Sequence, residues 1–295
     1  MLSLKIDELS YSQVQHYLQH AVAPRPICFA STVNKAGLVN LSPFSFFNLF
    51  STKPPVCVFS PSRRMRDNTT KHTLDNVLEV PEVVINVVSY SMVHQASLAS
   101  TEYPDGINEF KKAGFTELAS EIVRPPRVQE SPAQLECRVR DVIPLGETGG
   151  AGNLVVAEVL LIHVHQDVLN EDGQIDQAKL DLVARLGAAW YCRVTPESLF
   201  QVAKPFGPTG MGVDQLPEAI RLSPVLTGNH LGRLANVEKL PSREEVGEFG
   251  SRPEVKRLLD TFSGSGISRE LQLHRAAASL LEEGDVEGAW KVLLQ

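Results

Sequence analysis

The sequence predicts a β-barrel with helical additions, because short strand segments recur over 26–165 and helices are inserted among them without regular alternation. The clearest strand segments are 83–89, which is rich in β-branched residues, and two long ones at 135–144 and 154–165. Regular βαβ units are missing, so a doubly wound parallel sheet fits less well. Neither G-x-G-x-x-G between a strand and a helix nor G-x-x-x-x-G-K-[ST] occurs, which disfavours the standard nucleotide-binding loops.

The individual elements follow from local signals along the chain. Ser10 is a suitable N-cap for a helix to His20, which Pro24 would end. A strand over 26–33 leads through the Asn34–Gly37 turn into a partner strand that begins at Val39. The remaining segments are a strand over 56–60, a helix capped by Thr70 or Thr73 and ending at Glu79, and helices over 92–100 and 107–113.

The chain changes character after Val202, which predicts a first part over 1–203 and an extension over 204–295. Residues 204–241 are rich in proline and glycine and show little periodicity. Helical patterns follow at 253–262, 268–283 and 286–294. The last two form a helical hairpin that cannot bury its own apolar face, so we expect it to pack on the first part or on a partner subunit.

The net charge of −7 over 295 residues argues against a general affinity for nucleic acids or anionic membranes. No uncharged apolar stretch approaches the ~18 residues of a membrane span, and the first residues do not resemble a signal peptide. We therefore expect a cytoplasmic protein without nucleic-acid or membrane partners. Cys28, Cys57, Cys137 and Cys192 form no CxxC pair and are expected to be reduced, mostly buried thiols.

The segment 40–48, Asn-Leu-Ser-Pro-Phe-Ser-Phe-Phe-Asn, is a candidate surface for a flat ring. Ser42 and Ser45 offer hydroxyl and backbone donors beside three phenylalanines. A flavin ring needs polar contacts along its pyrimidine edge and apolar contacts at its dimethylbenzene side. The alternative is a barrel strand with core phenylalanines, which holds for at least one of the three rings in either case.

Positive charge is concentrated further along, at Arg63, Arg64 and Arg66 and then at Lys71-His72-Thr73. This cluster stands at a predicted helix start, where unpaired backbone N–H groups and the positive dipole end favour a phosphate. A hydroxyl and a guanidinium fork can add further hydrogen bonds. The alternative is a solvated basic loop before a capped helix.

His163 and His165 form an H-x-H pair on a predicted strand, a spacing that also occurs in metal sites. No third ligand stands at a recognisable distance, so we expect histidines on a strand face and no metal. No Ser-His-Asp or Cys-His arrangement indicates covalent catalysis, and no catalytic acid or base is assigned.

Taken in order, these motifs resemble the flavin reductase-like family, whose members fold as FMN-binding split β-barrels and include flavoredoxins. The resemblance spans roughly residues 20–195, and beyond about residue 205 it implies nothing. Its motifs are Arg25-Pro26-Ile27, the segment 40–48, Lys71-His72-Thr73, the turn 102–106 with Glu109-Phe110, and Arg185-Leu186-Gly187 with Tyr191. His72 stands where many members have aspartate, which leaves its role open.

The resemblance implies a homodimer with FMN bound near the subunit interface. It implies that Ser42, Pro43, Phe44 and Ser45 contact the flavin ring and that Asn48 orients that strand. Lys71, His72 and Thr73 would hold the phosphate, with Arg63 as a further contact. Arg185 and Tyr191 either complete the site or are structural. The turn 103–106 would lie near the open face of the flavin.

The predicted activity is that of an FMN-dependent oxidoreductase that takes hydride from NADH or NADPH. It would pass electrons to free flavin or to a partner protein such as a monooxygenase. One alternative is an FMN-binding electron carrier without its own nicotinamide site, and another is a binding or sensing protein whose C-terminal hairpin docks a partner. Pyridoxal phosphate, as in related oxidase barrels, is the alternative ligand.

Overall fold

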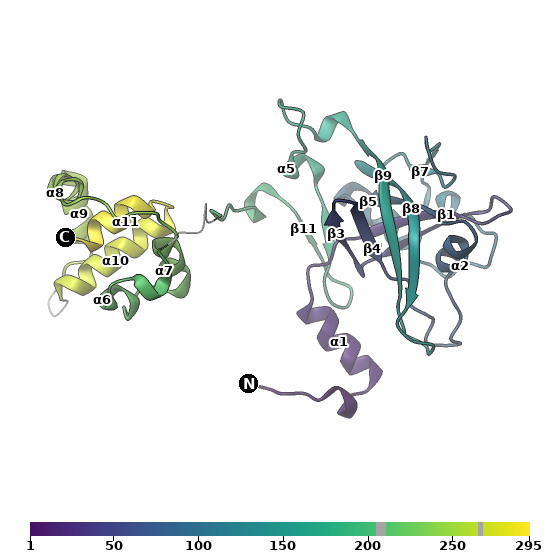
Figure 1. Cartoon of the computed structure of the whole chain (residues 1–295), viewed down its shortest axis with the longest axis horizontal. Coiled ribbons are helices and arrows are strands. Elements are labelled where there is room, and N and C mark those ends of the chain that lie inside the picture. Colours follow the sequence, from purple (N-terminus) through teal and green to yellow (C-terminus); the bar gives the residue numbers. More distant parts are fainter. Residues whose placement is uncertain (205–210, 265–267) are drawn as a thin grey trace. The chain divides into compact units, whose positions relative to one another are not determined.

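The structure is a computed structural model that describes residues 1–204, 211–264 and 268–295. The chain divides into two compact units, Met1–Phe200 and Gln201–Gln295 (Figure 1). Residues 205–210 of the expected proline- and glycine-rich connector lie outside the described residues. Within the described ranges, no helix combines the length and the apolar character that crossing a membrane requires.

The first unit is built on a seven-stranded sheet in the order β2-β1-β5-β8-β9-β4-β3, in which every neighbouring pair is antiparallel. The strands are β1 (Cys28–Val33), β2 (Val39–Phe44), β3 (Phe47–Thr52), β4 (Pro55–Phe59), β5 (Glu82–Val87), β8 (Ala133–Pro144) and β9 (Asn153–Val164). β2 and β3 lie at opposite edges, yet three residue steps join Phe44 to Phe47 and span at most about 11 Å. The sheet must therefore curl until its edges approach, which gives the expected split β-barrel.

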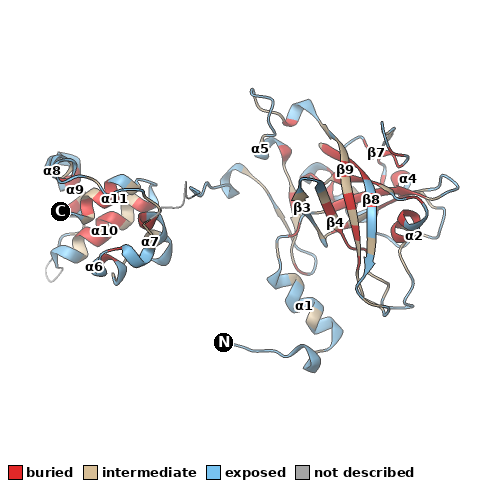
Figure 2. Ribbon diagram, in the orientation of Figure 1, coloured by how far each residue is buried: buried red, intermediate tan, exposed pale blue. Residues whose placement is uncertain are grey.

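The barrel interior is filled from alternate strand positions. In β9, buried residues alternate with half-buried ones, as expected when one face of a strand packs inward (Figure 2). Phe59, Ile85 and Cys137 belong to this core and are completely buried. The expectation for the cysteines is confirmed, since Cys28, Cys57 and Cys137 are buried and all four are free.

Helices and short strands surround the barrel. A second apolar cluster joins β1 and β2 to α3 (Val93–Leu98) and α4 (Glu109–Ala113) through the buried rings of Phe29 and Phe110. The smaller elements are α5 (Gln177–Leu180), β6 (Glu117–Leu118), β7 (Arg127–Val128), β10 (Val183–Arg185) and β11 (Tyr191–Arg193). β10 pairs with β11, and an isolated bridge joins Arg185 to Arg25 just before β1.

Two helices of the first unit bear on the candidate site. α1 (Tyr11–Ala21) begins at Ser10 as expected, through a capping box with Gln13, and contains no buried residue. α2 (His72–Glu79) begins one residue after Lys71, which is its N-cap. The expectation that Thr70 or Thr73 caps α2 is therefore wrong, because Thr73 lies inside the first turn and its hydroxyl accepts a hydrogen bond from Asn40.

The second unit contains more helices than the sequence indicated. They are α6 (Glu218–Arg221), α7 (Gly228–Ala235), α8 (Arg243–Ser251), α9 (Pro253–Thr261), α10 (Arg269–Glu282) and α11 (Val286–Leu293). Trp290 of α11 is 1% exposed, and its indole nitrogen donates to the Leu234 carbonyl at 3.0 Å. The terminal hairpin α10–α11 therefore buries its apolar face within this unit, and the expectation that it needs another body to pack on is wrong.

Candidate functional site

A cavity of about 300 Å³ opens at the end of β2. Pro43, Phe44 and Ser45 line it on one side, and Arg185 and Tyr191 line it on another. The structure thus brings three of the four expected ring residues together with the two residues whose role was left open. The aromatic ring of Phe44 also belongs to the barrel core, so it is fixed by packing and offers a rigid edge to a ligand.

A second, narrower hollow adjoins this cavity, since Ser100 lines both. Ser42, Lys71, His72 and Thr73 line it, so the expected phosphate motif lies together with the remaining ring residue. The other residues that line it are Asn40, Arg64, Ala99, Thr101, Glu102, Tyr103 and Glu109. The two expected halves of the site therefore form one continuous surface.

Lys71 joins the two halves. Its ammonium nitrogen lies 5.3 Å from the centre of the Phe44 ring, within the range of a cation–π contact. Burial lowers the pKa of Lys71, and the nearby Arg64 lowers it further, whereas Glu102 opposes the shift. A bound anion would stabilise these two neighbouring, partly buried cations, because its charge replaces the hydration that burial removes.

The start of α2 adds hydrogen-bond donors to this positive charge. The first N–H groups of a helix have no partner within the helix, and no side chain caps α2. Thr73 Oγ1 accepts from Asn40 Nδ2 at 2.8 Å, which leaves the hydroxyl proton free to point elsewhere. These donors beside Lys71 form a suitable environment for a phosphate.

Glu109 supports the strand that carries the site. Its carboxylate accepts a hydrogen bond from the Leu41 backbone N–H at 2.9 Å, which fixes α4 against β2. Burial raises the pKa of Glu109, while that hydrogen bond and the nearby His72 oppose the rise. His72 is the first residue of α2 and half-buried in the hollow.

Arg64 lines the narrower hollow, whereas Arg63 lines neither, although both make hydrogen bonds within their own loop. Arg63 donates to the side-chain and backbone oxygens of Asn68, both at 2.7 Å, and does not line either hollow. Arg64 lines the phosphate hollow, and its Nε lies 3.4 Å from a carboxylate oxygen of Glu102. Both arginines stand in the same loop, so the residue type alone could not distinguish them.

Asn48 does not join the site. It lies exposed on β3, and its side-chain oxygen accepts from the backbone N–H of Leu49 at 2.8 Å. Asn48 lines neither hollow, and its expected part in orienting the strand stays a prediction.

Arg185 and Tyr191 brace each other at the rim of the cavity. Arg185 Nη1 donates to the Tyr191 hydroxyl at 2.6 Å, and the guanidinium carbon lies 4.7 Å from the centre of that ring. Both residues are half-buried and line the cavity, so they combine a structural contact with access to a ligand.

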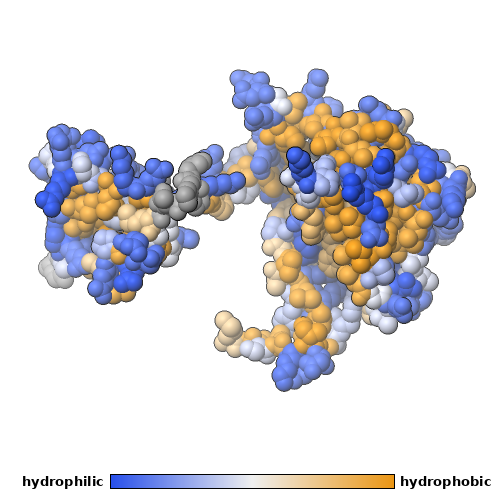
Figure 3. Space-filling view, viewed as in Figure 1, coloured by the Kyte–Doolittle hydropathy of each residue, from blue (hydrophilic) through white to orange (hydrophobic). Residues whose placement is uncertain are grey.

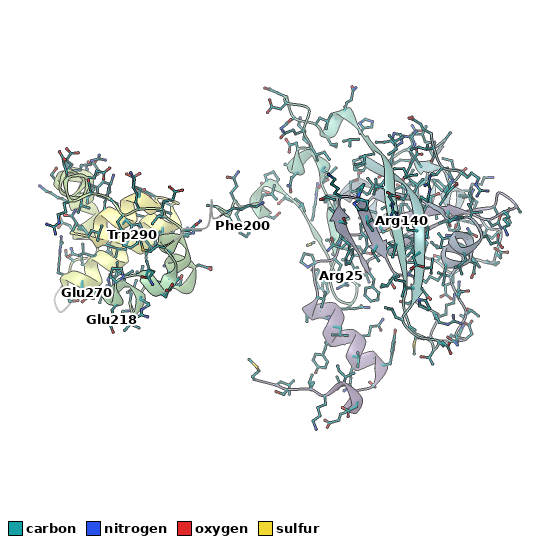
Figure 4. The ribbon with its side chains drawn as sticks, in the orientation of Figure 1. Arg25, Arg140, Phe200, Glu218, Glu270 and Trp290 are labelled. Carbon is teal, nitrogen blue, oxygen red and sulfur yellow. The ribbon has the colours of Figure 1, made fainter. Side chains whose placement is uncertain are left out.

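Arg25 of the Arg25-Pro26-Ile27 motif also lines the cavity, although the sequence motifs assign it no contact with the cofactor. Its side chain donates to the carbonyls of Gln19 and Val22 at the end of α1 and to the carbonyl of Leu186. Figure 4 labels Arg25 near the end of α1. The Nε of Arg25 is buried and has no hydrogen-bond partner in the described parts of the chain, although the residue lines the cavity. A buried donor without a partner is costly, which makes it a candidate contact for a ligand.

His163 and His165 have separate partners. His163 Nε2 lies 2.8 Å from a carboxylate oxygen of buried Glu136, and His165 Nδ1 lies 3.2 Å from exposed Asp167. Among the described residues, no group of three or more His, Cys, Asp or Glu side chains could hold a metal ion.

Comparison with known proteins identifies the first unit. The model of the flavin reductase like domain matches residues 20–180, which is more than half of the chain. The chain belongs to the flavin reductase-like family. Membership supports a flavin-binding oxidoreductase or electron carrier as the general class of this protein. An uncharacterised protein of Aquifex aeolicus is 36% identical over 181 residues, covering 61% of this chain and 90% of that protein.

Two solved structures that are similar to this chain give further comparisons. Nitrilotriacetate monooxygenase component B from Bacillus cereus is 28% identical with a TM-score of 0.64, covering 68% of this chain and 98% of that one. The 2-nitrobenzoate 2-nitroreductase of Pseudomonas fluorescens is 24% identical with a TM-score of 0.62, covering 70% of this chain and 99% of that one. The second likeness shows the fold alone. The residues that match the family model, 20–180, lie within the barrel unit and do not reach the helical unit.

Proposed function

We propose that this protein binds FMN, takes hydride from NADH or NADPH, and passes electrons to free flavin or to a partner protein. The observation that supports FMN most strongly is the placement of Lys71, Arg64 and the start of α2 beside the Pro43–Ser45 surface. The cations and backbone donors suit a phosphate, and the Pro43–Ser45 surface suits a flat ring. Riboflavin or another ring without phosphate would leave Glu102 as the carboxylate near the two cations.

The residues present fit the cofactor. Lys71, Arg64 and Thr73, with the first backbone N–H groups of α2, would hold the phosphate. Pro43, Phe44 and Ser45 would contact the ring, and the unpartnered Nε of Arg25 would donate to an oxygen or nitrogen at its edge. Arg63 and Asn48 are assigned to the scaffold, because neither side chain lines the two hollows.

When bound, FMN supplies the hydride and electron transfer chemistry. The chain supplies orientation and a polar environment. Phe44 is held by the barrel core and fixes one side of the ring pocket. Arg185, held by Tyr191, places a positive charge at the cavity, which favours an anionic form of a ligand there. No side chain is assigned a catalytic proton transfer.

We also propose that the active form is a homodimer. β3 is an edge strand and exposes Leu49 and Phe50, while Ile143 and Ile162 are exposed on β8 and β9. Figure 3 shows hydrophobic residues gathered on this face of the barrel. Exposed apolar surface of this kind is typical of protein interfaces, and a second copy would cover it.

A monooxygenase is the proposed electron-accepting partner. The B. cereus relative is a component of such an enzyme, and a protein of this kind would deliver reduced flavin to a separate oxygenase. A cytoplasmic location, expected from the composition, stays part of this proposal.

Stopped-flow mixing of the FMN-loaded protein with NADH or NADPH tests the reductase proposal. Loss of the flavin absorbance with either nucleotide, faster than the same change in free FMN, is the expected result. If neither nucleotide bleaches bound FMN while dithionite does, the protein is an electron carrier without its own nicotinamide site.

A further inference from the structure

The side of α1 that faces the site lines a groove of about 590 Å³. The helix residues that line it are Tyr11, Val14, Gln15, Leu18, Gln19 and Val22. Their spacing of three and four residues places them on one face of the helix. Pro43, Phe44, Ser45 and Phe46 line the opposite wall, so the groove runs along the surface that the ring pocket uses.

This face of α1 is not covered by the rest of its unit. No residue of α1 is buried, and Leu18 is 52% exposed. An amphipathic helix of a globular protein normally buries its apolar stripe, so an uncovered stripe beside a site is typical of a surface that binds a ligand or a partner.

α1 is held at both of its ends, which keeps the groove formed. At the last turn, the Arg25 guanidinium donates to the carbonyls of Gln19 and Val22. At the first turn, Tyr11 packs so closely on Gly150 that a Cβ there would lie 2.6 Å from the tyrosine ring. The helix is therefore fixed across the groove from Phe44 and Phe46.

The composition of the walls limits the ligand. None of the described residues that line the groove is acidic, and its two cations, Arg25 and Lys71, are the ones proposed to contact FMN. Gln15 and Gln19 line both the groove and the ring cavity, and their amides can donate to or accept from a polar edge. With FMN bound, a flat, uncharged aromatic molecule with carbonyl oxygens matches the remaining walls.

We propose that this groove binds the electron acceptor as a flat aromatic carbonyl compound, between Leu18 of α1 and Phe46 of the barrel. This inference rests on the proposed function and adds where the acceptor binds. With a quinone as the acceptor, the atoms and electrons of the overall reaction balance. The nicotinamide donor loses a hydride, and the quinone gains a hydride equivalent and a solvent proton to become the hydroquinone. Leu18 is then a residue that determines specificity, because its side chain is part of the contact surface.

Leu18→Ala tests the inference, with Tyr17→Ala as the matched control. Tyr17 is 42% exposed on the same helix but does not line the groove. The probe is menadione, titrated calorimetrically into full-length protein already loaded with FMN, whose own affinity is measured first for each variant. We expect Leu18→Ala to weaken menadione binding about fivefold to tenfold, the scale of losing much of one buried leucine contact. Tyr17→Ala and Leu18→Met should bind menadione as the unaltered protein does.

Other outcomes overturn the inference. If Leu18→Ala leaves menadione binding unchanged, or if both alanine variants weaken it equally, the helix face is not the acceptor site. A parallel loss of FMN affinity would show that the groove holds the cofactor instead. A change in sedimentation coefficient with Leu18→Ala would show that a second copy covers the face. Failure of the proposed function gives a different signal, namely no FMN binding by any variant.

Discussion

Removal of the Lys71 ammonium should weaken FMN binding far more than riboflavin binding. Lys71 is half-buried in the phosphate hollow, and Arg64 is the other cation that lines it. A hydrogen bond to a charged group contributes about 1.5–3 kcal/mol, and the upper half of this range applies where burial limits screening. For Lys71→Ala we expect a loss of about 2–3 kcal/mol, which corresponds to an increase in Kd of roughly 30- to 150-fold.

The assay is quenching of flavin fluorescence, with FMN and riboflavin titrated into the same preparations. Lys53→Ala is the control, because Lys53 is an exposed lysine between β3 and β4. Riboflavin affinity should change by less than about threefold in either variant, since it carries no phosphate. Equal losses for the two ligands, or an unchanged Kd for FMN, would refute the placement of the phosphate.

Thr73 allows a finer test within the same assay. Its hydroxyl accepts from Asn40, so Thr73→Ala removes a phosphate donor and also leaves a buried amide without its acceptor. Thr73→Ser keeps the hydroxyl and should retain FMN affinity, whereas Thr73→Ala should lower it. If Thr73→Ser loses as much FMN affinity as Thr73→Ala, the methyl group and not the hydroxyl matters.

Three further predictions follow from the electrostatics and the division of the chain. Glu102→Gln removes a carboxylate that pairs with Arg64 and Arg66, at 3.4 and 3.5 Å, and should strengthen FMN binding about twofold to fivefold, measured as Kd at low salt; weaker binding would mean that Glu102 helps to hold the cofactor. Because burial and Arg64 lower the pKa of Lys71, the free protein loses this charge at a lower pH than an ordinary lysine would, so FMN affinity should fall as pH rises through that pKa. In Lys71→Ala this alkaline fall should disappear from the Kd–pH profile, and a fall that persists would assign it to another group. A chain ending at Phe200 should fold and retain its FMN affinity, measured by circular dichroism and fluorescence titration, since the two units have separate cores; loss of FMN binding in the folded fragment would contradict this.

Much of the barrel could be predicted from the sequence because its signals are local. The strands around β1, β5, β8 and β9 carry β-branched and apolar patterns that survive in the structure. The sequence does not predict β3, because it is an edge strand with mostly exposed residues and no inside–outside alternation. The helices α6, α7 and α8 are not predicted either, because they are short and belong to a unit whose core is completed by Trp290, far along the chain.

In the candidate site too, local sequence motifs predict some residues, whereas the roles of others depend on contacts with distant parts of the chain. Compact sequence motifs predict Lys71, Thr73 and the segment Pro43–Ser45 as site residues. The cap of α2 was assigned wrongly because the hydroxyl of Thr73 is engaged by Asn40, on a strand that precedes it by 33 positions. The choice between Arg63 and Arg64 depends on the turn at Asn68, which has a positive φ of 58° and receives the Arg63 side chain. No residue pattern in the sequence specifies that turn.

Identification of the ligand that the purified full-length protein releases on denaturation tests the central claim most directly. Separation of the released material by chromatography distinguishes FMN from riboflavin, FAD and pyridoxal phosphate. The account predicts stoichiometric FMN, either in the protein as purified or after reloading and removal of excess ligand. Release of pyridoxal phosphate or FAD, or failure to retain FMN while retaining riboflavin, would contradict it.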